Sequence, residues 1–274
     1  MVTQMNDNSN HQTWKELKLV SKSLINTRFK DIYYVSQTGS TNSDLLFQAS
    51  QGAKEGLVLV AGHQNTGRGR LDRLWEAPPQ TNLLFSALIQ PEILPQSLQL
   101  VTPALALSLV NVLAGHNIKG EIKWPNDVWL SGKHHGKIAG ILAESVKVTD
   151  LSQTVVVGMG CNVAWPTSKD ELPFEATSLK EAGLVIDPEV LLTAVLLDFE
   201  SQIKRLENLN GSELLRQDLL EKSATIGKKV LVQQHSGNIE GQALDLDASG
   251  ALIVHDGTKE KSIFVGDVVH LHEL

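Results

Sequence analysis

The stretch from Ile122 to Val163 reads IKWPNDVWLSGKHHGKIAGILAESVKVTDLSQTVVVGMGCNV. It contains three apolar, strand-like segments with short polar connections, namely Ile122–Leu130, Lys137–Glu144 and Thr154–Val163. Consecutive strands without helices between them favour an antiparallel or mixed sheet over repeated strand-helix-strand units. We therefore predict a mixed β-sheet at the centre of the fold.

Further elements of both kinds surround this stretch. Short apolar runs predict strands at Ile32–Val35, Leu57–Ala61 and Leu83–Ile89. Capping residues and apolar periodicity predict helices from about Ser40 to Gly52, near Leu98–Leu113, from Ser178 to Gly183, and from Asp187-Pro188 through Ile203. Spaced apolar residues indicate one short helix nearer the N-terminus, at Trp14, Leu17 and Val20. The mixture predicts an α+β fold, with helices flanking the sheet.

The character of the chain changes after about Ser223. Short β-type runs then follow one another, separated by turn-forming pairs such as Ser236-Gly237 and Asp256-Gly257. These runs are Lys229–Gln233, Ile239–Leu246, Ala251–His255, Ser262–Val265 and Val268–Leu271. Five strands at this spacing indicate a small barrel. We therefore divide the chain into an N-terminal extension (1–30), a main domain (31–222) and a C-terminal β domain (223–274).

The composition is that of an ordinary folded protein. Of 274 residues, 42% are hydrophobic and 20% are charged, which excludes a disordered or disulfide-stapled chain. The net charge of −7 disfavours a general nucleic-acid binder. The first thirty residues lack a signal-peptide pattern, the apolar stretch Val101–Ala114 is too short for a membrane span, and the single cysteine, Cys161, suits a reducing compartment. We expect a cytoplasmic protein with neither nucleic acid nor membrane as a partner.

The densest chemical feature is the run Gly67-Arg68-Gly69-Arg70-Leu71-Asp72-Arg73-Leu74-Trp75, which places three arginines inside an acidic protein. Its two early glycines allow the backbone to wrap closely around an anion. The guanidinium groups supply forked donors that suit phosphate and carboxylate. A loop that closes over an anion and a solvated basic turn both remain open as interpretations.

Asp127 and Lys137 flank the connections in the quoted stretch. Pro125 and Asn126 break the chain between two apolar runs, which can place the Asp127 carboxylate at a strand end. Lys137 opens an apolar strand, so its ammonium would lie where a low-dielectric wall meets solvent, and the small residue Gly140 leaves room for a ligand. A salt bridge between Asp127 and Lys137 at a sheet edge is the alternative.

Three common nucleotide or metal motifs are excluded. The pair Gly158-x-Gly160 lacks the third glycine or alanine of a dinucleotide fingerprint. Gly132 and Gly136 are separated by three residues instead of the four of a phosphate-binding P-loop. The adjacent pair His134-His135 lacks the spacing of two metal ligands on one face of an element.

Taken together, these segments resemble the biotin protein ligases. The matching pieces are Ser40-Thr41-Asn42, Gln64 with Gly67-Arg68-Gly69-Arg70 and Trp75, Lys123-Trp124-Pro125-Asn126-Asp127, Lys137-x-Ala139-Gly140-Ile141-Leu142-x-Glu144, and Gly158-x-Gly160-x-Asn162. Their order and spacing are specific. The resemblance continues more weakly to the C-terminus, where the family has a small SH3-like barrel. It implies an α+β catalytic domain similar to that of class II aminoacyl-tRNA synthetases.

The resemblance also implies a two-step reaction. ATP and biotin give biotinyl-5′-AMP and pyrophosphate, and a lysine of a biotin carboxyl carrier domain then attacks the mixed anhydride to form an amide. Bringing a carboxylate to a triphosphate requires concentrated positive charge and Mg²⁺. The implied cofactors are thus ATP, biotin and Mg²⁺, the implied partner is the carrier domain of a biotin-dependent carboxylase, and no residue is assigned as a metal ligand.

The resemblance alone assigns residue roles. Lys137 would hold the biotin carboxylate and the α-phosphate, Arg70 would supply charge from a closing loop, and Asp127 would orient the incoming lysine or the adenylate. The residues implied in biotin binding are Ser40, Thr41, Asn42, Gln64, Gly67, Arg68, Arg70, Lys137, Gly140 and Gly158. Those implied in ATP or adenylate binding are Arg68, Arg70, Arg73, Trp75, Asn126, Lys137 and Asn162, with Trp75 against adenine.

Two alternative functions remain. Lipoate or octanoate ligases and transferases share the fold and a single lysine, but the Arg-Arg-x-x-Gly-Gly-Gly pattern that they carry is absent here. A non-catalytic biotin-binding regulator would not need the charged set of Lys137, Asp127 and Arg70. Residues 1–30 are too short for the winged helix of those family members that also repress transcription, so we expect a ligase without repressor activity.

Overall fold

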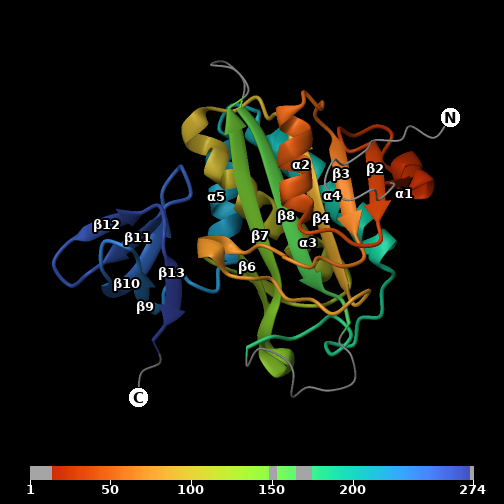
Figure 1. Cartoon of the computed structure of the whole chain (residues 1–274). Helices are drawn as coiled ribbons and strands as arrows, with labels where there is room; N and C mark the ends of the chain where they lie inside the picture. Colours follow the sequence, from red (N-terminus) through yellow and green to blue (C-terminus); the bar gives the residue numbers. More distant parts are fainter. Residues whose placement is uncertain (1–13, 148–152, 165–174, 272–274) are drawn as a thin grey trace.

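The structure, a computed structural model, describes residues 14–147, 153–164 and 175–271. Eight strands form one sheet in the order β1-β2-β3-β4-β8-β7-β6-β5 (Figure 1). They are β1 (Lys15–Glu16), β2 (Asp31–Val35), β3 (Leu57–Ala61), β4 (Asn82–Ile89), β5 (Gly120–Lys123), β6 (Asp127–Leu130), β7 (Gly136–Lys147) and β8 (Gln153–Asn162). Strands β2 and β3 are parallel and the other neighbouring pairs are antiparallel, so the predicted mixed sheet is confirmed.

The segment Ile122–Leu130 contains two strands and not one, and the predicted break at Pro125 and Asn126, with Asp127 at a strand end, is confirmed. This segment is a hairpin of β5 and β6, with Lys123 paired to Asp127 across the turn. The turn contains Pro125, whose peptide bond with Trp124 is cis. Because proline fixes φ and lacks an N–H, a single strand does not continue through this position. Asp127 consequently opens β6 instead of lying inside a strand.

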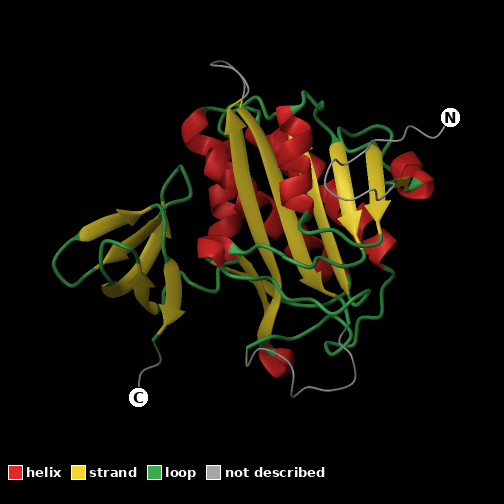
Figure 2. Cartoon of the chain, in the orientation of Figure 1, coloured by secondary structure: helices red, strands yellow, loops and turns green. Residues whose placement is uncertain are grey.

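Helices cover both faces of the sheet (Figure 2). Helix α2 (Thr41–Ser50) packs on one face, where Leu45 and Ala49 join a buried cluster with Leu59, Leu88 and Val156. The opposite face carries the other helices of the described part, namely α1 (Lys18–Ser23), α3 (Val101–Gly115), α4 (Pro188–Leu206) and α5 (Gly211–Glu221). The start of α2 therefore lies over strands β4 and β8 on a face that the larger helical layer leaves open.

Helix α3 is the long apolar helix predicted near Leu98–Leu113. A 3₁₀ helix, η2 (Pro95–Leu100), leads into it. The segment Pro95–Gly115 has the length and the mean hydropathy, 1.7, of a membrane span, but 56% of its apolar 18-residue stretch is buried inside the fold. Residues such as Ala104 and Leu107 pack in the main core, so α3 is a buried core helix as predicted. Two shorter 3₁₀ helices are η1 (Arg70–Asp72) and η3 (Gly132–His134).

Two helix predictions differ from the structure. The expected helix at Ser178–Gly183 is only a turn. Ser178 Oγ accepts the Glu181 N–H at 3.3 Å, as in a helix cap, but Gly183 has φ +89°, a left-handed conformation that ends the helical turn. Helix α5 was not predicted, although Leu215 and Leu219 give it a buried stripe. Helix α4 begins as predicted, with Asp187 Oδ1 accepting the Glu189 N–H at 2.7 Å.

The five C-terminal runs form a separate antiparallel sheet beside α5 (Figure 1). Its strands are β9 (Lys229–Gln233), β10 (Ile239–Leu246), β11 (Leu252–His255), β12 (Glu260–Ile263) and β13 (Asp267–His270). Their order is β12-β11-β10-β9-β13, and within residues 225–271 no ladder joins β12 to β13. By its hydrogen bonds, this unit is an open five-stranded sheet and not a fully closed barrel.

Candidate active site

A strip of bare backbone crosses β7 and β8 beneath the start of α2. This glycine strip comprises three residues: Gly140 on β7, and Gly158 and Gly160 on β8. Gly140 pairs with Gly160, and Gly158 lies two residues from Gly160 on the same face of the sheet. A Cβ on Gly158 would lie 2.1 Å from Asn42 Oδ1, and one on Gly160 would lie 2.5 Å from Trp75 Nε1. Other groups approach the strand backbone this closely only because these residues are glycines.

Polar side chains at the start of α2 form a buried hydrogen-bond chain beside the glycine strip. Gln64 Oε1 accepts the Thr41 N–H at 2.7 Å. Thr41 Oγ1 lies 2.7 Å from Ser86 Oγ, which in turn donates to Asn42 Oδ1 at 2.6 Å. Because each group is fixed by a partner, this wall of the site is set before a ligand binds.

One residue of this chain of hydrogen bonds was not predicted. The structure brings together the group that the sequence singled out, namely Ser40, Thr41, Asn42 and Gln64. Ser86 joins them from β4, where it is fully buried. Its signal in the sequence is that it is the only hydroxyl in the apolar run Leu83–Ile89, and a buried hydroxyl needs a polar partner.

Lys137 and Asp127 form an ion pair within the sheet. Lys137 Nζ lies 2.7 Å from Asp127 Oδ1, and the two residues stand on the neighbouring strands β7 and β6. The salt bridge considered as an alternative to catalysis is therefore present, but β6 and β7 are interior strands and not an edge. Lys137 Nζ also lies 5.5 Å from the centre of the Trp75 ring. The pairing fixes the lysine while leaving it facing a cavity.

Two asparagines of the predicted site hold backbone groups. Asn162 Nδ2 donates to the carbonyl oxygens of Lys137, at 3.3 Å, and Thr177, at 3.1 Å, while its Oδ1 accepts from Asn82. Asn126 Nδ2 donates to the carbonyl oxygen of Ile141 at 2.9 Å. Asn162 is thus a support for the Lys137 backbone, with its amide occupied by protein groups.

The run Gly67–Trp75, which we call the arginine loop, folds back on itself. Its ends are tied by the Trp75 N–H, which donates to the carbonyl oxygen of Gly67 at 2.9 Å. Two of its apolar side chains, Leu71 and Leu74, are 46% and 67% exposed. Few apolar contacts therefore hold the loop in place.

Carboxylates hold the three arginines of this loop. Arg68 Nη2 lies 3.0 Å from Glu144 Oε1 on β7. Asp267, at the start of β13, lies 2.6 Å from Arg73 Nη2 and 3.6 Å from Arg70 Nη1. Burial lowers the pKa of Arg70, an effect that Asp267 opposes. In this structure the loop arginines pair with the protein's own carboxylates, Glu144 and Asp267.

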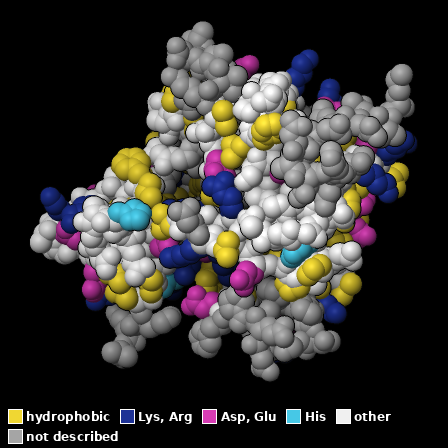
Figure 3. Space-filling model, in the orientation of Figure 1, with side chains coloured by type: hydrophobic (Ala, Val, Ile, Leu, Met, Phe, Trp, Pro, Cys, Tyr) yellow, Lys and Arg dark blue, Asp and Glu magenta, His cyan; other side chains and the backbone are white. Residues whose placement is uncertain are grey.

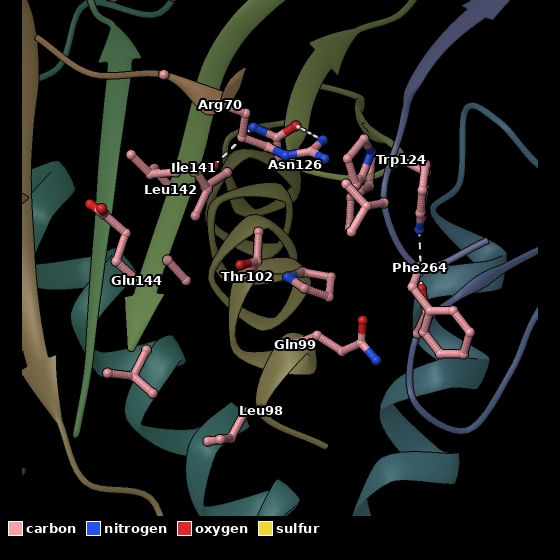
Figure 4. Close-up of a pocket in the computed structure, with 18 of the residues that line it drawn as sticks. Arg70, Leu98, Gln99, Thr102, Trp124, Asn126, Ile141, Leu142, Glu144 and Phe264 are labelled. Atoms are coloured by element: carbon pink, nitrogen blue, oxygen red, sulfur yellow. Dashed lines mark hydrogen bonds between the residues drawn. The ribbon is translucent and has the colours of Figure 1, made fainter. Parts of the chain in front are cut away.

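Three cavities meet around these groups. The glycine cavity, about 150 Å³, contains the glycine strip and the start of α2. The tryptophan cavity, about 460 Å³, is lined by Trp75, Trp129 and Lys123. Lys137 and Asp127 line both of these cavities. A third cavity, about 480 Å³, lies between β7, the start of α3 and the C-terminal sheet (Figure 4).

Most of the predicted site residues line the glycine cavity. These are Ser40, Thr41, Asn42, Gln64, Arg68, Arg70, Arg73, Trp75, Asn126, Asp127, Lys137, Gly140 and Gly158. Gly67 and Asn162 lie outside its lining. Near the middle of the face shown in Figure 3, Lys and Arg side chains lie beside Asp and Glu side chains.

Comparison with known proteins agrees with this geometry. Residues 34–162 match the biotin/lipoate A/B protein ligase family, and residues 225–271 match the biotin protein ligase C-terminal domain. A biotin–[acetyl-CoA-carboxylase] ligase of Mycobacterium tuberculosis is 35% identical over 251 residues, covering 89% of this chain and 90% of that protein. The bifunctional ligase/repressor of Bacillus subtilis is 32% identical over 85% of this chain and 71% of its own length.

Solved structures give the same result. The biotin protein ligase from Aquifex aeolicus in complex with biotin and ATP superposes with a TM-score of 0.74 and 26% sequence identity. The match covers 89% of this chain and all of that one. The family match, the relatives and the solved structures all indicate the same family, and they agree with the two sheets and the site described above. This chain belongs to the biotin protein ligases.

Proposed function

We propose that the protein is an ATP-dependent biotin–[acetyl-CoA-carboxylase] ligase that forms biotinyl-5′-AMP and transfers biotin to a lysine of a carboxyl carrier domain. One observation carries the proposal: Lys137 and Asp127 stand where the glycine cavity and the tryptophan cavity meet. The small, polar glycine cavity and the larger tryptophan cavity therefore share the Lys137 ammonium group. That is the arrangement needed to join an acid to a nucleotide.

In the first step, a biotin carboxylate oxygen attacks the α-phosphorus of ATP and pyrophosphate leaves. Both reactants are anionic, so their approach requires fixed positive charge at the meeting point. Lys137 supplies it from a strand whose backbone is held by Asn162 and Thr177. Arg68 and Arg70 add charge from the arginine loop, which lies over the same cavity.

The tryptophan cavity suits the nucleotide. Trp75 offers an aromatic surface for a base, whereas Trp129 is 7% exposed and packs against Lys123 and His135. Lys123 Nζ lies 4.4 Å from the centre of the Trp129 ring and adds a cation to the cavity wall. Lys137 lines the same cavity, with its Nζ 5.5 Å from the centre of the Trp75 ring, so a nucleotide bound there can present its phosphates to that ammonium.

The implied Mg²⁺ fits as a companion of the nucleotide. Within the described residues, no group of three or more His, Cys, Asp or Glu side chains is arranged to hold a metal. Mg²⁺ in such sites is commonly held by substrate phosphates with one or two carboxylates. Asp127, which lines both cavities and lies beside Lys137, is a carboxylate placed to contact it. The ion would neutralise phosphate charge.

In the second step, the carrier lysine attacks the carbonyl carbon of the mixed anhydride, and AMP leaves with the electrons of the broken C–O bond. The attacking amine must first lose a proton. Asp127, already placed 2.7 Å from one ammonium group, is suited to orient a second one. The arginine loop meanwhile covers the anhydride and limits its hydrolysis by water.

The proposal is tested by incubating the purified chain with biotin, MgATP and no carrier, and then detecting biotinyl-AMP by mass spectrometry. Lipoate and octanoate in place of biotin test the alternative acids. Addition of the carrier domain should convert the adenylate into one modified lysine. An adenylate formed from lipoate but not from biotin would contradict the proposal, as would biotin binding without any adenylate.

A further inference from the structure

The C-terminal sheet contributes one charged side chain to the cavities around Lys137. Asp267, the first residue of β13, lines both the glycine cavity and the tryptophan cavity, and its side chain is only 17% exposed. A carboxylate beside a site for a polyphosphate repels that ligand unless cations neutralise it. A direct contact with the nucleotide phosphates therefore does not explain why a carboxylate stands at this position.

Two arginines of the arginine loop supply the neutralising charge. Arg73 Nη2 lies 2.6 Å from Asp267, and Arg70 Nη1 lies 3.6 Å from it. Arg70 Nη1 also donates to the carbonyl oxygen of Gly266 at 3.3 Å and to Asn126 Oδ1 at 3.3 Å. Arg70 therefore connects the loop, the turn between β5 and β6, and the segment Gly266-Asp267 where β13 begins.

The C-terminal sheet can act as an anchor because other contacts fix it to the main domain. Trp124 Nε1 donates to the carbonyl oxygen of Gly250 at 3.1 Å. Arg216 Nε, on α5, donates to the carbonyl oxygen of Leu246 at 2.6 Å. Neither contact involves β13 or the arginine loop. The sheet thus stays in place when the loop moves.

We propose that Asp267 is a positioning residue that holds Arg70 and Arg73, and with them the arginine loop, closed over the acyl-adenylate between the two reaction steps. This inference rests on the proposed function. Because the loop has few apolar anchors, loss of the one carboxylate shared by two arginines weakens its closed state. The expected consequence is escape of biotinyl-AMP, more than slower chemistry at Lys137, which β7 holds independently.

The experiment measures how fast biotinyl-AMP leaves the enzyme. The full chain and its Asp267→Asn variant are loaded with radiolabelled adenylate made in place from biotin and MgATP, separated from free nucleotide, and followed by filter binding. We expect release to accelerate about tenfold in the variant, equivalent to about 1.4 kcal/mol. The single-turnover rate of adenylation should change by a smaller factor.

Three further variants separate positioning from a general structural effect. Asp256→Asn removes the same charge from the turn between β11 and β12, where Asp256 pairs with Lys261 at 2.7 Å, and it should leave release unchanged. Asp267→Glu keeps the charge and should restore slow release. In an Arg73→Gln background, Asp267→Asn should accelerate release less than it does in the unaltered chain.

Unaltered release from folded Asp267→Asn, or equal acceleration by Asp256→Asn, would overturn the role of Asp267 while leaving the proposed function intact. If Asp267→Asn does not fold, Arg73→Gln should accelerate release and Asp267→Glu should not, and equal rates for these two variants would overturn the proposal. Absence of biotinyl-AMP from the unaltered chain would overturn the proposed function and this inference together.

Discussion

The glycine cavity and the arginine loop form one site but are held in different ways. Around the cavity, Thr41 and Ser86 are 3% and 0% exposed and are tied by short hydrogen bonds. In the loop, the Arg68 and Arg73 side chains are 42% and 68% exposed and are tied by ion pairs. Breaking a buried hydrogen bond costs about 1–3 kcal/mol, whereas an exposed ion pair contributes about 0.2–1 kcal/mol.

This contrast indicates a division of labour. The strand-borne part of the site is formed in advance and can select and activate the acid, because its groups need no rearrangement. The loop-borne part has weaker contacts, and at the exposed Arg68 phosphate oxygens can replace the Glu144 carboxylate as the partner of the guanidinium group. Substitutions in the two parts should therefore affect different steps of the reaction.

The largest effect is expected at Lys137, on the strand-borne side. Lys137→Ala removes the ammonium where the carboxylate meets the α-phosphate and should slow adenylation by about 10²–10³-fold. Lys137→Arg should restore only part of the rate, because a planar guanidinium does not replace a compact charge close to the sheet. The rate of biotinyl-AMP formation in a single turnover is measured for both variants. A near-normal rate for Lys137→Ala would show that Lys137 serves only as the ion-pair partner of Asp127.

The next effect is expected at the glycine strip. A Cβ on Gly158 would lie 2.1 Å from Asn42 Oδ1, so Gly158→Ala must displace the polar wall of the cavity. Overpacking of this kind costs about 1–3 kcal/mol, which corresponds to a loss of about 5- to 150-fold in biotin affinity. Calorimetric titration with biotin measures the loss. Gly115→Ala, where a Cβ would meet nothing within 4 Å, is the matched control. Equal affinities for the two variants would mean that the cavity is not preformed.

A smaller effect, on a different step, is expected at Arg70. Arg70→Gly removes the contacts with Asn126, Gly266 and Asp267 and should let biotinyl-AMP escape about tenfold faster, since hydrogen bonds to charged groups contribute about 1.5–3 kcal/mol. The released anhydride should then modify lysines of bystander proteins. Mass spectrometry of serum albumin added to the reaction measures this. A variant that still modifies only the carrier lysine would contradict the covering role of the loop.

The smallest effect is expected at the most exchangeable contact. Arg68→Gln breaks the pair with Glu144, and because the Arg68 side chain is 42% exposed the contact should be weak. An exposed pair contributes about 0.2–1 kcal/mol, so adenylate release should rise by less than about fivefold. Parallel release assays on Arg68→Gln and Lys137→Ala would show whether the two parts of the site are separable. A larger effect at Arg68 than at Arg70 would reverse the proposed order of the loop contacts.

Local sequence patterns predicted most of the strand-borne part, though not Ser86, and identified the arginines of the loop without predicting their contacts, for a physical reason. Capping residues and apolar runs are local signals, and they located α2 and β8, while the small residue Gly140 indicated room for another group against the sheet. The contact between Arg70 and Gly266 spans 196 positions in the chain, and no local pattern encodes it. The position of the Trp75 ring against the glycine strip likewise depends on how the loop folds over the sheet.

The most direct test of this division is amide hydrogen exchange of residues 66–76 in the empty, biotin-bound and adenylate-bound protein. The account predicts rapid exchange in the empty protein, little added protection with biotin alone, and clear protection once the adenylate offers a phosphate to the arginines. Residues 155–161 of β8 should remain protected in all three states and serve as the internal control. Equal protection of residues 66–76 in the three states would show that the arginine loop is preformed, and would contradict the central claim.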